Sequence, residues 1–429
     1  MSKFDVVIVG SGIGGATLAK ELTKKGKKVL IIEKGRSYPF NQLGAETEAY
    51  KFYDKHGLWS KTREGIFYYR TIMTGGTSVV SCGNAVRSLE KELKKLGIVL
   101  KKEFIETERE LGVTAVPKSH IGKGTGKIIK AAEKLGFRMK PMPKLIDFKK
   151  CASCGKCILG CRFDAKWTAL RYLKEALNNG ATLLEETNIT RVLVSKSRVI
   201  GVEGCNPKGK KTRIFGKNVI LAAGGLGTPV ILQNSKVKSG QKLFLDLFMV
   251  VMGVANTEKG SIKELTMAAV HHNKGFILSP FVDNPVALVS VVPVPLRQHL
   301  NIMAHSAQML GIMVKIKDDS VGRVYNSGLI EKIVTEKDFS KLNKGINLSK
   351  KILIKAGVGS KGIITTKIRG AHPGGTAAIG EVVDKNLETK IKGLYVCDAS
   401  VLPEAPGLPP IVTIIALAKR LGKFLEKKI

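Results

Sequence analysis

Hydrophobic and polar residues follow two different patterns along this chain, and the first of these patterns predicts an α/β fold. The apolar run Phe4–Val9 is typical of a buried strand, the stretch 16–25 has helical spacing, and 28–32 is a second apolar run. A further run at 217–221 also leads into a glycine-rich turn and a helical stretch. Strands that alternate with helices in this manner predict a parallel sheet covered by helices.

Residues 236–365 follow a different pattern. Apolar runs of β type occur at 276–278, 286–294 and 313–316, with one helical stretch at 340–356 and no glycine-rich nucleotide turn. We therefore predict a discontinuous nucleotide-binding domain, made of residues 1–235 and 366–429 and including a cysteine-rich loop at 145–165. A β-rich substrate domain, 236–365, would be inserted into it.

The last helical stretch is amphipathic. Its apolar stripe consists of Ile414, Leu417, Leu421 and Leu425. The basic residues on its other positions are Lys419, Arg420, Lys423 and Lys427. This pattern favours a helix docked on the core with a wet basic face over a helix lying on a membrane surface.

Composition narrows the class of protein. The 429 residues are 44% hydrophobic and 25% charged, ordinary values for a globular protein, and the formal net charge is +36. The positive charge is spread along the chain without the aromatic set of an RNA-binding motif, so we expect no nucleic-acid partner. A solvated lysine coat is the favoured interpretation, followed by contact with an acidic partner or an anionic membrane.

The chain also lacks the patterns of membrane insertion and export. Its best apolar candidate, 243–255, is shorter than the ~18 residues a spanning helix needs and is interrupted by Asp246. The first predicted strand begins at Phe4, without the pattern of a signal peptide. These features predict a cytoplasmic protein, with peripheral contact at the inner face of the membrane left open.

The turn after the first strand reads Gly10-Ser11-Gly12-Ile13-Gly14-Gly15 and has the G-x-G-x-x-G pattern. Glycines there allow a sharp turn and bring backbone N–H groups against a pyrophosphate at a helix N-terminus. Glu33 ends the second strand, where it can accept hydrogen bonds from an adenosine ribose. The acid argues against a ribose 2′-phosphate and leaves both FAD and NAD open.

Four of the seven cysteines lie within eleven residues, as Cys151-x2-Cys154-x2-Cys157-x3-Cys161. This spacing is that of the bacterial ferredoxin run and favours an iron–sulfur cluster over zinc or no metal. Since only one run is present, either Cys161 turns back onto the same cluster or another cysteine completes it. A three-iron cluster is a further alternative, and we favour four irons. The other cysteines are Cys82, Cys205 and Cys397.

Blocks along nearly the whole chain resemble the glucose–methanol–choline (GMC) family of FAD oxidoreductases, especially its cholesterol-oxidase-like and long-chain-alcohol-oxidising branches. Beyond the fingerprint these are 75–78 with 82–84, 221–229, 372–380, 398–400 and 411–418. The resemblance implies an FAD-binding Rossmann-like domain and a dehydrogenase that moves hydride from an alcohol to flavin N5, with a hydrophobic alcohol as one candidate substrate. It implies these cofactor-binding residues: Gly10, Gly12, Ile13, Gly14, Gly15, Glu33, Lys34, Gly75, Gly76, Thr77, Ser78, Cys82, Gly83, Asn84, Ile189, Ala223, Gly224, Thr228, Asp398, Ala399, Pro410 and Ile411.

The resemblance also implies that His372 is the catalytic base, a role suited to an imidazole. The family's second polar residue, an Asn or His, falls on Pro409, whose side chain can neither donate nor accept a hydrogen bond. Another residue could substitute, the substrate could differ from a simple alcohol, or the flavin could reduce a C=C bond.

Some family members that carry a cysteine-held cluster pass electrons to a partner protein. The leading hypothesis is accordingly an alcohol dehydrogenase whose electrons leave through the cluster. Its rivals are a reductase of an unsaturated lipid or isoprenoid, supplied by an electron-donating protein, and a non-catalytic electron-transfer subunit.

Overall fold

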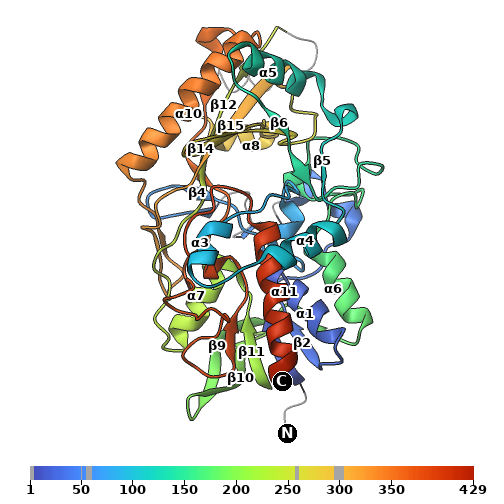
Figure 1. The fold of residues 1–429 in the computed structure, drawn as a ribbon, viewed down its shortest axis with the longest axis vertical. Helices are drawn as coiled ribbons and strands as arrows, with labels where there is room; N and C mark the ends of the chain where they lie inside the picture. Colours follow the sequence, from blue (N-terminus) through green and yellow to red (C-terminus); the bar gives the residue numbers. More distant parts are fainter. Residues whose placement is uncertain (1–3, 50, 55–59, 257–259, 294–303) are drawn as a thin grey trace.

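The computed structural model of the protein describes residues 4–49, 51–54, 60–256, 260–293 and 304–429. Two sheets lie toward opposite ends of the long axis, each covered by helices, and the chain passes between them several times (Figure 1). This arrangement confirms the predicted α/β fold with a second, sheet-rich part.

The first sheet is the Rossmann-like one. Its strand order is β8 (Thr182–Leu184), β2 (Val29–Ile32), β1 (Phe4–Val9), β11 (Lys211–Leu221), β10 (Arg198–Cys205) and β9 (Asn188–Ser195), with β20 (Leu394–Val396) beside β11. Strands β8, β2, β1, β11 and β20 pair in parallel, as the alternation of strands and helices predicts. Helix α1 (Ile13–Thr23) starts three residues before the predicted 16–25 stretch, within the glycine-rich motif and directly after Gly12.

The second sheet is mostly antiparallel. Its order is β3 (Ser60–Lys61), β4 (Phe67–Tyr68), β19 (Arg369–Gly370), β12 (Leu247–Val254), β15 (Met309–Ile316), β14 (Phe276–Pro280), β13 (Ala269–Asn273) and β6 (Lys140–Pro141), with β18 (Ile364–Thr365) beside β12. Helices α10 (Glu336–Lys355) and α5 (Lys123–Lys134) pack against it. Distant segments thus meet here, because β3, β4 and β6 precede 236–365 and β19 follows it.

The remaining helices are α2 (Glu46–Ala49), α3 (Glu90–Lys95), α4 (Lys101–Glu110), α6 (Ala169–Asn178), α7 (Gly224–Asn234), α8 (Pro285–Val291) and α11 (Ile411–Lys428). The remaining strands are β5 (Thr114–Ala115), β7 (Pro143–Lys144), β16 (Arg323–Val324) and β17 (Ile330–Glu331).

The β-type interpretation of 286–294 is wrong, since most of this run forms helix α8. Asn284 caps the helix by accepting a hydrogen bond from the backbone N–H of Ala287 at 2.8 Å. Residue 294 lies outside the described residues. A short apolar run shows no periodicity that distinguishes a strand from a helix. Here the cap at Asn284 marks the start of a helix.

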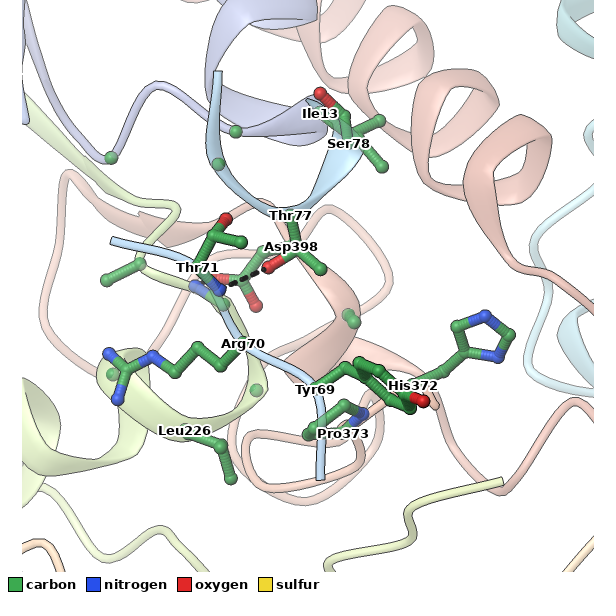
Figure 2. Close-up of a pocket in the computed structure, with 18 of the residues that line it drawn as sticks. Ile13, Tyr69, Arg70, Thr71, Thr77, Ser78, Leu226, His372, Pro373 and Asp398 are labelled. Atoms are coloured by element: carbon green, nitrogen blue, oxygen red, sulfur yellow. Dashed lines mark hydrogen bonds between the residues drawn. The ribbon is translucent and has the colours of Figure 1, made fainter. Parts of the chain in front are cut away.

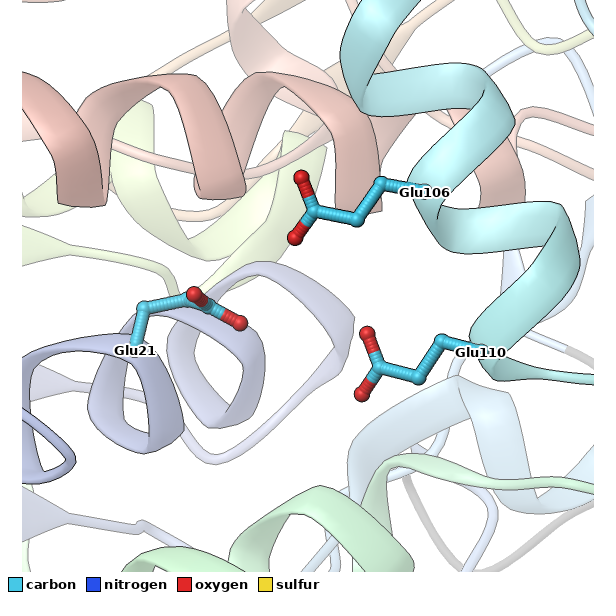
Figure 3. Close-up of side chains that lie close together, drawn as sticks. All are labelled: Glu21, Glu106 and Glu110. Carbon is cyan, nitrogen blue, oxygen red and sulfur yellow. The ribbon is translucent and has the colours of Figure 1, made fainter.

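Helix α11 docks on α1 and α4, as its apolar stripe predicts. The expectation of a wet basic face is wrong for Lys419, which is buried together with Lys20 beside Glu21, Glu106 and Glu110. Figure 3 shows the three carboxylates, which lie close together. Lys419 Nζ lies 2.8 Å from Glu106 and 2.5 Å from Glu110. The buried ammonium groups offset the carboxylate charge, so the cluster joins three helices as an ion-pair network.

None of the helices in the described part of the chain is both long and apolar enough to cross a membrane. The apolar run at 243–255 instead supplies β12, at the centre of the second sheet.

Candidate active site

A cavity of about 600 Å³ is lined by residues from both sheets. Most residues predicted to bind the cofactor or substrate belong to its wall. They are Gly10, Gly12, Ile13, Gly14, Glu33, Lys34, Gly76, Thr77, Ser78, Cys82, Asn84, Ile189, Ala223, Gly224, His372, Asp398, Ala399, Pro409, Pro410 and Ile411. Figure 2 shows part of this wall, with Tyr69, Arg70 and Thr71 on one segment and His372 and Pro373 on another.

The other predicted residues, Gly15, Gly75, Gly83 and Thr228, lie behind this wall and hold it in place. Gly75 N–H donates to Ser11 Oγ at 3.0 Å, and Thr228 Oγ1 donates to Asp398 at 2.5 Å. Gly15 packs so tightly that a Cβ would lie 2.0 Å from the Gly10 carbonyl oxygen. Gly15, Gly75 and Thr228 thus support residues of the wall without lining the cavity themselves.

The glycine turn fits a pyrophosphate. A Cβ on Gly10 would lie 2.2 Å from the Ala222 carbonyl oxygen, whereas one on Gly12 would meet nothing within 4 Å. No side chain caps the start of α1, so its first N–H groups are left to face an anion. The turn thus combines close packing behind with an open, hydrogen-bond-donating face in front.

Two carboxylates are fixed beside this turn. Glu33 Oε2 accepts hydrogen bonds from the Ser11 N–H at 2.9 Å and from its hydroxyl at 2.7 Å. Asp398 accepts from Gly224 N–H at 2.9 Å and from Ser400 N–H at 2.7 Å, and burial raises the pKa of Asp398. Both groups line the cavity in orientations set by the backbone, which suits an adenine dinucleotide with hydroxyl-bearing sugar groups and a pyrophosphate.

Substituting Gly14 by alanine is expected to prevent normal flavin binding. The new Cβ would lie 1.8 Å from the Cys397 carbonyl oxygen, so helix α1 must move away from β20 and the turn must distort. We expect purified Gly14→Ala protein to retain at most a small fraction of the wild-type flavin, measured by absorbance after denaturation. Gly126→Ala is the matched control, since a Cβ there meets nothing within 4 Å. Full flavin content in Gly14→Ala would contradict this account of the turn.

No polar partner was predicted for the His372 side chain, and the structure supplies two. Its Nδ1 is 2.8 Å from Asp246 Oδ2 and 2.8 Å from Lys315 Nζ, and these two atoms are 3.1 Å apart. Asp246 is fully buried with φ of 51°, and it also accepts from Gly407 N–H at 2.9 Å. Burial, with the Lys315 charge adding, lowers the pKa of His372 to about 4, although Asp246 opposes this.

Neither partner of His372 was predicted, yet the sequence carries a signal for each. Asp246 interrupts an apolar run, and Lys315 is the lone charge within the apolar strand β15. Charged residues in such positions are seldom buried unless they are paired. Asp246 is separated along the chain from Lys315 by 69 positions and from His372 by 126 positions. A motif of fixed short spacing cannot predict contacts between residues this far apart in sequence.

The wall near His372 is largely apolar. It includes Tyr69, Phe248, Met267, Phe281 and Met313. Behind this wall Arg369 forms two 2.8 Å hydrogen bonds with Asp283 and another at 3.1 Å with the Tyr69 hydroxyl. This buried ion pair orients the aromatic side chain without exposing a charge to the cavity.

The four cysteines of the run line a second, smaller hollow together. No three of their Sγ atoms lie within 4.8 Å of one another. A tetrahedral zinc site, with Zn–S of roughly 2.3 Å, would bring them to about 3.8 Å, so the loop does not fit zinc as it stands. Thiolates around an iron–sulfur cluster are farther apart, and the loop's backbone bends sharply at Ser153, Gly155 and Gly160.

Two buried lysines separate this hollow from the large cavity. Lys144 Nζ donates to Cys82 O at 3.0 Å and Asn84 Oδ1 at 2.6 Å, while Lys166 Nζ donates to Cys157 O at 2.9 Å and to Ser81 O. Among the described residues, no carboxylate pairs with either ammonium. Burial lowers the pKa of Lys144 to about 8 and lowers that of Lys166.

The remaining cysteines occupy different places. Cys82 lines the large cavity, and burial together with the nearby Cys157 raises the pKa of its thiol. Cys397 is buried against the Gly14 carbonyl, and Cys205 ends β10. Of the three, Cys82 is thus the one that lies next to the cysteine run.

Comparison with known proteins gives two family matches. Residues 4–248 match the N-terminal profile described as GMC oxidoreductase, and residues 330–418 match the C-terminal profile of the same description. An uncharacterized protein of Methanocaldococcus jannaschii is 36% identical over 97% of this chain and 98% of its own length. A long-chain-alcohol oxidase of Arabidopsis thaliana is 25% identical over 99% of this chain and 68% of its own length.

Solved structures share the fold. Pyridoxine 4-oxidase from Mesorbium loti has a TM-score of 0.75 at 16% identity, covering 98% of this chain and 99% of that one. A formate oxidase of Aspergillus oryzae, studied for its FAD modification, has a TM-score of 0.78 at 17% identity, covering 100% and 98%.

Proposed function

Because the chain belongs to the GMC oxidoreductase family, and is therefore an FAD-dependent oxidoreductase of alcohols or similar substrates, we propose that it is a dehydrogenase. Its substrate would be a hydrophobic alcohol, and its electrons would leave through an iron–sulfur cluster to a partner protein. An oxidase returns electrons to oxygen from the flavin directly and has no need of such an exit.

The observation that carries this proposal is the pairing of the cysteine hollow with Lys144 and Lys166. Two ammonium groups buried without carboxylates are costly unless a negative group offsets them. An iron–sulfur cluster on four thiolates carries net negative charge and would supply it. Lys166 spans the two sites, since it lines the hollow and bonds to Ser81 on the wall of the cavity.

In the catalytic step, this chain supplies the base. FAD, when bound, supplies the ring nitrogen N5 that accepts a hydride from the carbinol carbon. His372 Nε2 takes the hydroxyl proton as the C–H bond breaks, leaving a carbonyl product and one proton on the imidazole. The neutral form of His372, favoured by its lowered pKa, has the free electron pair that this requires.

The substrate class follows from the wall around His372. Tyr69, Phe248 and Phe281 give flat apolar surfaces, and Met267 and Met313 give adaptable ones. Such a surface gains most from burying hydrocarbon. It therefore supports an alcohol that carries an apolar chain or ring.

The electron partner would dock over the cysteine run. Exposed Lys149, Lys150, Lys156 and Arg162 surround this loop, and Phe163 is 45% exposed beside them. A cationic rim with an apolar point fits an acidic one-electron carrier protein. The two electrons would pass to that carrier one at a time. The protons released by oxidation of the alcohol would return to solvent.

Anaerobic purification followed by iron, sulfide and flavin analysis tests the proposal. We expect about four irons and four sulfides per flavin, with an EPR signal from the dithionite-reduced protein that broadens rapidly on warming. Flavin without iron, in protein never exposed to air, would remove the electron exit and make an oxygen-using oxidase the better assignment.

A further inference from the structure

The polar group missing at Pro409 has a counterpart on the second sheet. Pro409 lines the cavity but offers neither donor nor acceptor. Lys315, on β15, lines the same cavity and is 1% exposed, with its ammonium against His372 and Asp246. A lysine buried this deeply at the reaction centre needs an explanation beyond packing.

Hydrogen-bond geometry restricts what Lys315 does. Asp246 and Lys315 both lie 2.8 Å from Nδ1 of His372, and a single ring nitrogen cannot serve both as donor and acceptor. The Asp246 pKa is lowered by the Lys315 charge and the His372 hydrogen bond despite burial, so this carboxylate is ionised and accepts the Nδ1 proton. Lys315 then donates to Asp246 across 3.1 Å. The electron pair of the imidazole is left on Nε2.

We propose that Lys315 is a positioning residue for alcohol oxidation, a proposal that rests on the proposed role of His372 as base. Its ammonium fixes the Asp246 carboxylate that holds the imidazole, and its positive charge adds to burial in opposing protonation of the imidazole. Lys315 thereby supplies a polar group at a reaction centre where Pro409 offers none, and it acts through the imidazole.

The charges around this unit are few. Asp246 and Lys315 are the charged groups that act on His372. Behind them Asp318, which accepts from Leu245 N–H at 3.1 Å, is paired with buried Lys332 at 2.8 Å. Cys82 also faces Lys315. Removing the Lys315 charge therefore leaves burial as what opposes the effect of Asp246 on the imidazole.

Lys315→Met tests the proposal by a shift in pH dependence. Without the ammonium, Asp246 stabilises the imidazolium, so the His372 pKa rises and the acid limb of kcat/KM moves up by about one pH unit or more. Titration of 13C-labelled histidine by NMR should show the same rise for the resonance missing in His372→Gln. Lys315→Arg, which keeps the charge, should restore a limb near that of wild type.

Lys332→Met is the matched control, because it removes a fully buried lysine from an aspartate without contact to His372. It should lower the melting temperature and leave the pH profile in place. An unshifted limb and an unshifted NMR titration in Lys315→Met would overturn the proposal. Lys315→Gln takes its place should the methionine variant not fold. If His372→Gln retains full turnover, the assignment of the base fails instead, whatever the outcome for Lys315.

Discussion

Replacing His372 with glutamine is expected to lower the rate of flavin reduction by an alcohol by about 10²- to 10⁴-fold, the usual contribution of a general base. Glutamine keeps a polar side chain of similar reach, so Asp246 and Lys315 retain a hydrogen-bonding neighbour. It has no electron pair that can take the hydroxyl proton near neutral pH. The rate is measured by anaerobic stopped-flow absorbance, where bleaching of the flavin reports hydride arrival.

His272→Gln is the control, since His272 lies on strand β13 and is exposed. It should bleach at the wild-type rate. Both variants should keep wild-type flavin content, because neither residue packs against the glycine turn. Unimpaired bleaching in His372→Gln would place the base elsewhere, and Lys315 would be the next group to test. A wild-type protein that no alcohol bleaches would instead favour the reductase or relay interpretations.

The cofactor side of the site was predictable from sequence because its chemistry is local. Gly10, Gly12 and Gly14 lie in one turn, and Glu33 ends the adjacent strand, so spacing alone brings them together. The strand, turn and helix carry their own signals in apolar pattern and in glycine. The structure brings these residues to the same cavity wall, as predicted.

The substrate side was predictable only in part. His372 was identified through family resemblance. Lys315 reaches it from β15 and Asp246 from the residue just before β12, and no local pattern encodes the pairing of these two strands. Helix α8 was mistaken for a strand because its apolar run is too short to show a period. Lys419 was assigned to solvent because three acidic residues on two other helices, which neutralise it, are far away in sequence.

A substitution in the cysteine run is the second change for which we expect a large effect. Cys157→Ser is expected to lower the iron content by about tenfold or more, since loss of a ligand costs at least as much as loss of its supporting contacts. Mixing wild-type protein with an alcohol under anaerobic conditions, then freezing, should give the EPR signal of the reduced cluster. The variant should bleach its flavin at a similar rate and give no such signal, because His372 and the hollow are separate sites.

Cys205→Ser separates this effect from the loss of any thiol, since Cys205 ends β10 and does not line the hollow. It should retain both iron and signal. Cys82→Ser distinguishes the two ways of completing a cluster. If Cys161 closes the run, Cys82→Ser keeps a four-iron cluster, whereas a cluster completed by Cys82 would lose iron. Equal turnover with oxygen in wild type and Cys157→Ser, with no cluster signal in either, would mean that uncharged acceptors, the backbone carbonyls and Asn84 Oδ1, are enough to hold Lys144 and Lys166. Electrons would then leave from the flavin.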